Sequence, residues 1–400
     1  MNLHSHYPYW LLRHGIINSY PSLDRDVTAD VAIMGAGISG ALVAWQLCNA
    51  GFSVVMADRR HAGMGSTAAS TSLLQYEIDE PLNKLIEKAG EKNATRSYIL
   101  CREAIYTLKN ICRELNDDDL FQLKPSLQFA SFKKHTADLK TEYELRKKIG
   151  FSLEFLDEKE ICKKYGFKKP AALLSRDGAQ ADAYKITHRL LEKCISSGLR
   201  SYNHTDIINI RHHKKGIELI TENKKKIKAK YLVIACGYES QQYIPQKLET
   251  LHSTYAIISE PMLKKDFWYK NSLIWETASP YIYLRTTADN KIIIGGKDVP
   301  FTDPVKRDKQ LTIKARELER SFFKLFPQIP FKTDFKWAGS FAATKDGLPY
   351  IGSIRQRPHT FFALGYGGNG ITFSVIAAEI IRDLITGKNN PDAGIFSFNR

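Results

Sequence analysis

The 400-residue sequence lacks the features that mark several specialised classes of protein. It has only six cysteines, none spaced C-x-x-C, so neither a zinc site nor a disulfide framework is predicted. No apolar run approaches the roughly 18 residues of a membrane span, and Met1 to Trp10 lacks the apolar core of a secretion signal. No internal repeat or low-complexity linker is present. Reduced thiols and a missing signal together predict a cytoplasmic protein without a transmembrane segment.

The composition that is present is that of a globular protein, with 43% hydrophobic and 25% charged residues. The length favours two structural units, or one domain that carries a large insertion. The formal net charge is +15, which raises the question of an anionic partner such as nucleic acid. Many of the positive charges fall at predicted turns, for example in 211–215 and 224–230, where water solvates them. We therefore expect no nucleic-acid partner.

Two styles of secondary structure alternate along the chain. The first style is strand, glycine turn and helix, as in 30–58, and it predicts a parallel α/β sheet. The second style has helices followed by alternating strands, as in 252–296, and it predicts an antiparallel sheet. The fold class is therefore α/β with an α+β insertion. The α/β domain is assigned to residues 25–80, 170–240 and 336–400, and the inserted domain to residues 81–169 and 241–335.

A glycine fingerprint lies between the first predicted strand and its helix. It reads Gly35-Ala36-Gly37-Ile38-Ser39-Gly40, and its glycines permit a tight turn, close approach of a pyrophosphate and helix-to-strand packing. The helix that follows offers free N–H groups to an anion. Asp58, at the end of the second strand, is placed to accept hydrogen bonds from a ribose diol, and Arg59 beside it can face the adenine or a phosphate. These residues predict a dinucleotide site.

Five motifs, in order along the chain, resemble the glycine oxidase, sarcosine oxidase and D-amino-acid dehydrogenase group of FAD-dependent oxidoreductases, within the D-amino-acid oxidase superfamily. The motifs are Gly65-Ser66-Thr67-Ala68-Ala69-Ser70, Ala181-Asp182-Ala183-Tyr184, Val233-Ile234-Ala235-Cys236-Gly237, Asp346-Gly347-Leu348-Pro349-Tyr350-Ile351-Gly352 and Gly365-Tyr366-Gly367-Gly368-Asn369-Gly370. Two positions depart from the group's pattern, since Ala183 replaces a proline and Cys236 a threonine. The resemblance implies a Rossmann-like FAD-binding domain and a substrate domain with a large antiparallel sheet.

The resemblance also implies FAD as cofactor. The expected cofactor-binding residues are Gly35, Ala36, Gly37, Ile38, Ser39, Gly40, Asp58, Arg59, Gly65, Ser66, Thr67, Ala68, Ala235, Cys236, Gly237, Gly367, Gly368, Asn369, Gly370, Ile371 and Thr372. A helix that begins near Ile371 can aim N–H groups at the flavin pyrimidine, where the reduced flavin carries negative charge. Some relatives attach the flavin to a cysteine in the segment that corresponds to 337–344, which has no cysteine here. Others attach it to a histidine where this chain has Ala68-Ala69. We therefore expect non-covalent FAD.

For the substrate, the resemblance implies a small amine or amino acid that passes a hydride to flavin N5. Arg285, at the end of a predicted strand, is the candidate for gripping a substrate carboxylate through two parallel hydrogen bonds, and Tyr255 is the candidate for covering the substrate. Thr372 stands where some oxidases have a lysine that speeds reaction with oxygen. The electron acceptor could therefore be either oxygen or a quinone.

Three alternatives remain open from the sequence. They are an RNA-associated FAD oxidoreductase of the tRNA-modifying kind, a NAD-linked Rossmann dehydrogenase, and a flavin-holding protein without turnover.

Overall fold

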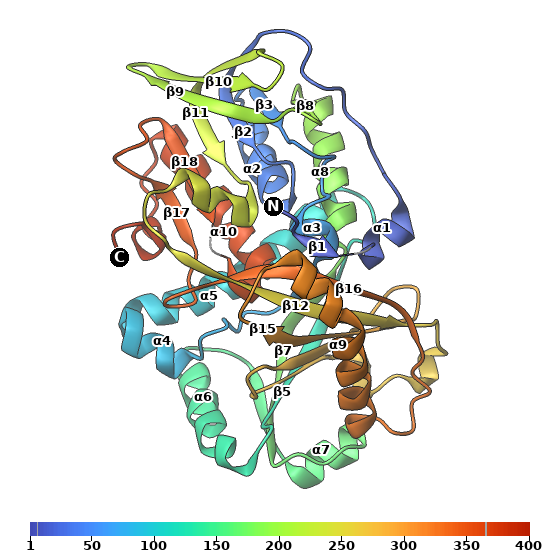
Figure 1. The fold of residues 1–400 in the computed structure, drawn as a ribbon. Helices are drawn as coiled ribbons and strands as arrows, with labels where there is room; N and C mark the ends of the chain where they lie inside the picture. The colour runs from blue at the N-terminus through green and yellow to red at the C-terminus, as the bar shows by residue number, and fades with distance from the viewer. Residues whose placement is uncertain (6, 365) are drawn as a thin grey trace.

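The computed structural model describes residues 1–5, 7–364 and 366–400, and its strands form two sheets that lie one above the other (Figure 1). Gly365, the first residue of the C-terminal glycine motif, therefore lies outside the described residues. The upper sheet has eight strands and the lower sheet has ten. The expected fold class, a Rossmann-like domain with a second domain built on a large antiparallel sheet, is confirmed.

The upper sheet is parallel at its centre, in the order β17-β18-β11-β2-β3-β8. Its strands are β2 (Val27–Met34), β3 (Val54–Ala57), β8 (Arg200–Tyr202), β9 (Ile207–His213), β10 (Gly216–Thr221), β11 (Lys226–Ile234), β17 (Tyr350–Ser353) and β18 (Thr360–Leu364). The apolar runs 31–34 and 54–57 are buried throughout, as parallel strands covered on both faces require. The edge strands β9, β10 and β17 are antiparallel additions.

Helices from distant parts of the sequence pack together beside this sheet. The helix α2 (Ile38–Asn49) contacts both α8 (Ala183–Ser196) and α10 (Gly370–Thr386), while α5 (Glu91–Glu114) packs on α10 and on α4 (Leu82–Ala89). Their apolar faces form one continuous core with the strands. In the described part of the chain, no helix is both long and apolar enough to span a membrane.

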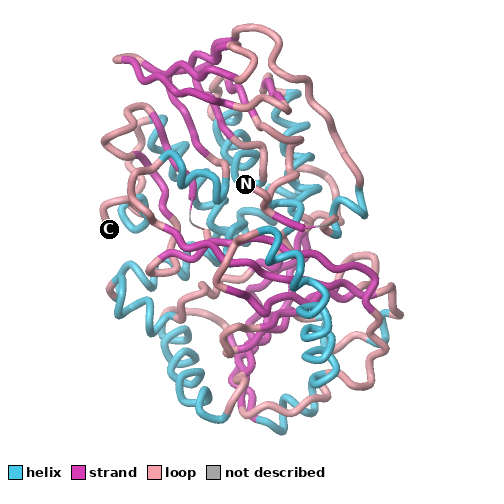
Figure 2. The backbone as a smooth tube through the Cα atoms, viewed as in Figure 1, coloured by secondary structure: helices cyan, strands magenta, loops and turns pink. Residues whose placement is uncertain are grey.

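The lower sheet is antiparallel except where β5 meets β13, and its order is β1-β16-β12-β15-β14-β13-β5-β7-β4, with β6 paired to β7. Figure 2 shows its strands crossing the middle of the molecule, below the upper sheet. The strands are β1 (His4–Ser5), β4 (Leu73–Leu74), β5 (Phe121–Phe129), β6 (Leu153–Asp157), β7 (Ala171–Ala181), β12 (Glu249–Ser259), β13 (Leu273–Glu276), β14 (Ile282–Thr286), β15 (Ile292–Val299) and β16 (Thr333–Thr344). The remaining helices are α1 (Tyr9–His14), α3 (Ser66–Ala69), α6 (Thr136–Lys148), α7 (Glu158–Tyr165) and α9 (Pro304–Leu325), and single 3-10 turns lie between elements.

Three strands of the lower sheet come from ranges that the sequence assigns to the cofactor domain. They are β4, β7 and most of β16. The chain therefore passes between the two sheets inside these segments. The residue ranges of the two domains stay a prediction.

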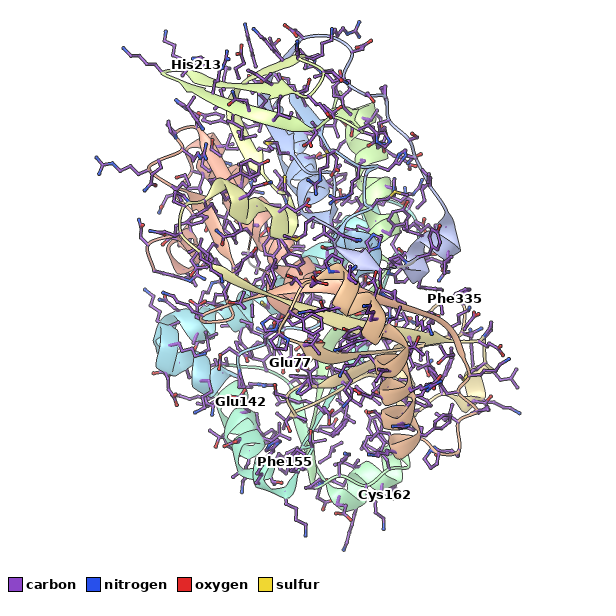
Figure 3. The ribbon with its side chains drawn as sticks, viewed as in Figure 1. Glu77, Glu142, Phe155, Cys162, His213 and Phe335 are labelled. Carbon is purple, nitrogen blue, oxygen red and sulfur yellow. The ribbon has the colours of Figure 1, made fainter. Side chains whose placement is uncertain are left out.

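A buried charge cluster fixes α6 against the segment that enters the upper domain. Arg146 is 1% exposed, and its Nε and Nη2 donate to Glu142 at 2.9 and 2.7 Å. Its Nη1 lies 3.7 Å from an oxygen of Glu77, which is also buried (Figure 3). Glu142 in turn accepts the backbone N–H groups of Leu82 and Asn83 at the start of α4. The cluster thus joins three segments.

Replacing Arg146 with methionine should destabilise the protein by about 3–5 kcal/mol, because it leaves two buried carboxylates without their cation. Urea unfolding followed by circular dichroism measures the change. Lys148→Met, on the same helix, is the matched control, since Lys148 is 71% exposed and its pair with Glu91 should contribute less than about 1 kcal/mol. Equal effects of the two substitutions would contradict this account of the cluster.

Candidate cofactor and substrate cleft

A long cleft runs along the carboxyl ends of the parallel strands, on the side that faces the lower sheet. From the upper domain it is lined by the residues after β2 and β3, by 235–239 after β11, and by the C-terminal glycine loop. From the lower sheet, β14 and β16 complete the wall. Open α/β sheets bind ligands at this edge of the strands.

The fingerprint glycines in the cleft are required by close contacts. Gly35 has a φ of +103°, and a Cβ there would lie 2.5 Å from the carbonyl oxygen of Ala235. A Cβ on Gly40 would lie 1.9 Å from the carbonyl oxygen of Gly35. Gly37 is the N-cap of α2, and no side chain caps that end of the helix. The free N–H groups of the first turn therefore face the cleft, apart from that of Ile38, which donates to Thr67 Oγ1 at 3.0 Å.

Asp58 supports this turn from the end of β3. Its carboxylate accepts the N–H of Ala36 at 2.7 Å and that of Arg60 at 2.8 Å, and it also lines the cleft. Burial raises the pKa of Asp58, although these hydrogen bonds act in the opposite direction.

Beyond Asp58, Arg59 and Arg60 both pair with the buried Glu239, which also contacts the N-terminal ammonium group. These are the two cationic side chains among the described lining residues of the cleft.

Beside the N-terminus of α2, where Ser39 Oγ lies 2.7 Å from Ser374 Oγ, the C-terminal glycine loop leads into α10. The N–H of Gly368 donates to the carboxylate of Asp79 at 2.6 Å. A Cβ atom added to Gly367 or to Gly368 would clash with that carboxylate, at 2.6 and 2.5 Å. Asn369 donates to the carbonyl oxygens of Gln75 and Glu77 at 3.0 and 2.8 Å. No side chain caps α10 at its N-terminus, so the first-turn N–H groups beside Gly370 and Ile371 meet the cleft.

The wall from the lower sheet is aromatic and hydroxyl-rich. Tyr281 and Tyr283 line it with ring centroids 5.9 Å apart, together with Thr254 and Phe341. Tyr283 lies across Gly295 of the neighbouring strand, where a Cβ would come within 2.3 Å of its hydroxyl oxygen. Burial raises the pKa of Tyr283 to about 12. Its hydroxyl group is therefore neutral at neutral pH.

Most of the expected cofactor residues line the cleft, and the others lie one layer behind it. The lining residues are Gly35, Gly37, Ile38, Ser39, Asp58, Arg59, Gly65, Ser66, Thr67, Ala235, Cys236, Gly237, Gly367, Gly368, Gly370 and Ile371. The five that do not line it are Ala36, Gly40, Ala68, Asn369 and Thr372. Ala36 donates to Asp58 and Gly40 packs on Gly35, which both line the cleft. Asn369 donates to Glu77, Thr372 donates to Asn369, and Ala68 is fully buried.

The two expected substrate residues do not line the cleft, and the structure corrects both expectations. Tyr255 is fully buried in the apolar core of the lower domain, because successive residues of a strand face opposite sides and it is Thr254 that faces the cleft. Arg285 lies behind the cleft wall. Its Nη1 donates to the carbonyl oxygens of Thr71, Ser72 and Ala181, each at 2.9 Å. That guanidinium edge is occupied and cannot hold a carboxylate in the cleft.

The sequence analysis missed the lower wall of the cleft. It identified 281–285 as a strand, and two-residue alternation along that strand would have placed Tyr281 and Tyr283 on one face. No local signal marks Thr254 and Phe341, which line the cleft, or Asp79, which accepts a hydrogen bond from the lining residue Gly368. Each takes its place through contacts between segments far apart in the sequence.

The family model for FAD dependent oxidoreductases, DAO, matches residues 30–384 of the chain. The chain is 25% identical over 96% of its length to YhfW of Bacillus subtilis, named as a Rieske 2Fe-2S iron-sulfur protein, and covers 73% of that protein. It is 24% identical over 92% of its length to gamma-glutamylputrescine oxidoreductase of Escherichia coli, and covers 86% of it. The crystal structure of glycine oxidase from Geobacillus kaustophilus superimposes with a TM-score of 0.79 at 21% identity, over 94% of this chain and 99% of that one.

Gly40→Ala should destabilise the protein by about 3 kcal/mol or more, because the added methyl group meets the backbone oxygen of Gly35, which cannot move without breaking the turn. Thermal unfolding measures the effect. Gly394→Ala is the control, since nothing lies within 4 Å of a Cβ there. A Gly40→Ala protein as stable as the control would show that the turn is not tightly packed.

Proposed function

The chain belongs to the DAO family of FAD-dependent oxidoreductases, and from that premise we propose that it oxidises the C–N bond of a small amine or amino acid. The observation that carries the proposal is the pair of helix N-termini, those of α2 and α10, that lie side by side on one cleft without side-chain caps. The relatives named for glycine and gamma-glutamylputrescine oxidation support the substrate class. The family assignment favours FAD over NAD as the cofactor.

The residues of the cleft fit FAD as an elongated ligand with a charged centre. The backbone around Gly35 and Gly37 leaves room for a pyrophosphate, and the α2 N-terminus supplies N–H groups and a partial positive charge. Asp58 is positioned for the ribose of the adenosine, and the α10 N-terminus for the pyrimidine edge of the flavin. The five residues in the layer behind would fix the positions of these groups.

The lower wall would hold the substrate against the flavin. When bound, FAD supplies the acceptor for a hydride from the carbon that carries the amine. Tyr281, Tyr283 and Thr254 offer neutral hydroxyl groups for hydrogen bonds, and Phe341 offers an apolar surface that excludes water. Their contribution is to position the C–H bond and to keep the site dry, which accounts for much of the rate gain in such reactions. No acid or base among them is needed if the amine enters neutral.

We propose that the FAD is held without a covalent bond. The loop that carries Ala68 and Ala69 has no histidine, and the strand segment 337–344 has no cysteine. Precipitation of the yellow protein with acid should therefore leave about one equivalent of FAD in the supernatant, measured by absorbance and chromatography. Flavin that stays with the protein pellet would contradict this prediction.

Anaerobic mixing of the FAD-loaded protein with a panel of amino acids, primary amines and N-methyl amines should bleach the flavin absorbance with at least one compound. The corresponding carboxylic acids and alcohols, which lack the amine, are the controls and should leave the spectrum unchanged. Dithionite reduction shows in each sample that the flavin is reducible. A protein bleached by dithionite but by no amine would be a flavin-holding protein of another function.

A further inference from the structure

A second cavity, of about 340 Å³, lies behind the wall of the cofactor cleft. It is bounded by α1, by the strands β5, β7 and β14 of the lower sheet, and by the start of α8. Residues Thr71 and Ser72 separate the two spaces, since they line the cleft while their carbonyl oxygens accept hydrogen bonds from Arg285, which lines the second cavity. Its size is within the range of small-molecule sites.

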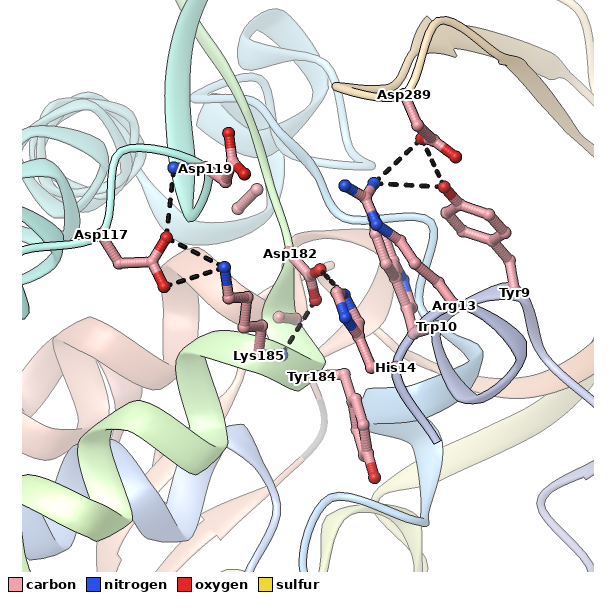
Figure 4. A network of polar contacts seen from close by, with 12 residues as sticks. Tyr9, Trp10, Arg13, His14, Asp117, Asp119, Asp182, Tyr184, Lys185 and Asp289 are labelled. Carbon is pink, nitrogen blue, oxygen red and sulfur yellow. Dashed lines mark hydrogen bonds and ion pairs between the residues drawn. The ribbon is translucent and has the colours of Figure 1, made fainter. Parts of the chain in front are cut away.

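The charges around the mouth of this cavity are already paired with one another (Figure 4). Arg13 pairs with Asp289 at 2.9 Å, and Lys185 pairs with Asp117 at 2.8 Å. Asp182, a lining residue that is 5% exposed, accepts from His14 at 2.6 Å and from the N–H of Lys185 at 2.9 Å. None of these carboxylates forms an ion pair with a cation deeper in the cavity, although the charge of Asp182 acts on Arg285 from nearby.

Two cations deeper in the cavity form no ion pair among the described residues, although the charge of Asp182 acts on Arg285 and the Trp10 ring centroid lies 5.6 Å from its guanidinium carbon. Lys124 is 7% exposed, lines the cavity, and makes neither a side-chain hydrogen bond nor an ion pair. Arg285 is 3% exposed, and its Nε and Nη1 donate only to backbone carbonyl oxygens, which leaves Nη2 without a hydrogen bond. Burying a cation without a counter-charge is costly, and two neighbouring cations add mutual repulsion.

The electrostatics of the two groups agree with this geometry. Burial, and after it the charge of Arg285, lower the pKa of Lys124 to about 8, so its ammonium group is still mostly protonated at neutral pH. Burial lowers the pKa of Arg285 to about 10, and its guanidinium group is charged as well. The remaining acids of the lining, Asp118 and Asp119, are exposed on the rim, where water screens them.

We propose that this cavity is a binding site for a small oxyanion, with Lys124 Nζ and Arg285 Nη2 as its two charged donors. A carboxylate or a phosphate group has oxygen atoms for both donors and cancels the repulsion between them. The site is distinct from the cofactor cleft, so its occupant is neither the FAD nor the substrate that the flavin oxidises. Unlike the proposed oxidation, this site does not depend on which compound bleaches the flavin.

Isothermal titration of the FAD-loaded protein tests the proposal, with inorganic phosphate in one series and succinate in another, in a buffer free of other oxyanions. At least one of the two should bind with a dissociation constant below about 1 mM. Heat from phosphate alone would assign a phosphate ligand, and heat from succinate alone would assign a carboxylate. Absence of binding by both anions would overturn the proposal without any variant.

Lys124→Met should weaken that binding at least tenfold, because methionine keeps much of the length of the side chain and removes its charge. It should not lower the melting temperature of the anion-free protein, since it removes an unpaired buried cation. Lys140→Met, at an exposed lysine on α6, is the control and should bind like the wild type. Equal anion affinities of the wild type and Lys124→Met would overturn the assignment. If the methionine variant fails to fold, Lys124→Gln provides the same comparison.

Discussion

The cleft depends on the position of one short segment, Gln75–Asp79, which is held from both domains. From the lower domain, Arg146 lies 3.7 Å from the buried carboxylate of Glu77. From the upper domain, Asn369 donates to two carbonyl oxygens of the segment, and Asp79 accepts the N–H of Gly368. Because Glu77 and Asn369 are shut off from water, each needs its partner, and the segment has little freedom to shift. It thereby fixes the glycine loop and the N-terminus of α10.

Both glycine turns of the cleft use the same arrangement of acid and backbone. Asp58 accepts the N–H of Ala36 inside the first glycine turn, at 2.7 Å, and Asp79 accepts the N–H of Gly368 inside the last, at 2.6 Å. Burial raises the pKa of both carboxyl groups, and the backbone hydrogen bond opposes that shift in each case. A glycine turn has no side chain to hold its shape, so a carboxylate that binds its N–H group keeps the turn in place before any ligand arrives. Such preorganisation lowers the cost of binding.

How much of this could be read from the sequence depends on how local each signal is. The fingerprint 35–40 could be predicted because the strand, the turn and the helix are adjacent in the chain. The alternation of two structural styles similarly predicted both sheets. The strands β4, β7 and β16 were harder, since each belongs to the lower sheet through pairing with residues far away in the sequence. Thr254 reaches the cleft, and Asp79 reaches Gly368 beside it, by the same kind of distant contact, and no local pattern marks them.

Arg285 shows where strand periodicity stops being sufficient. Tyr283 and Arg285 are two apart on β14, and Tyr281 stands just before it at the same spacing, so their side chains project from the same face of the lower sheet. Periodicity fixes the face but not what covers it at each step. Above the tyrosines the face is open to the cleft, whereas at Arg285 the segment 71–72 crosses over and offers its carbonyl oxygens. The guanidinium group that could have faced a substrate therefore forms part of the wall between the two cavities. Its Nη2, which makes no hydrogen bond, is on the residue that lines the second cavity.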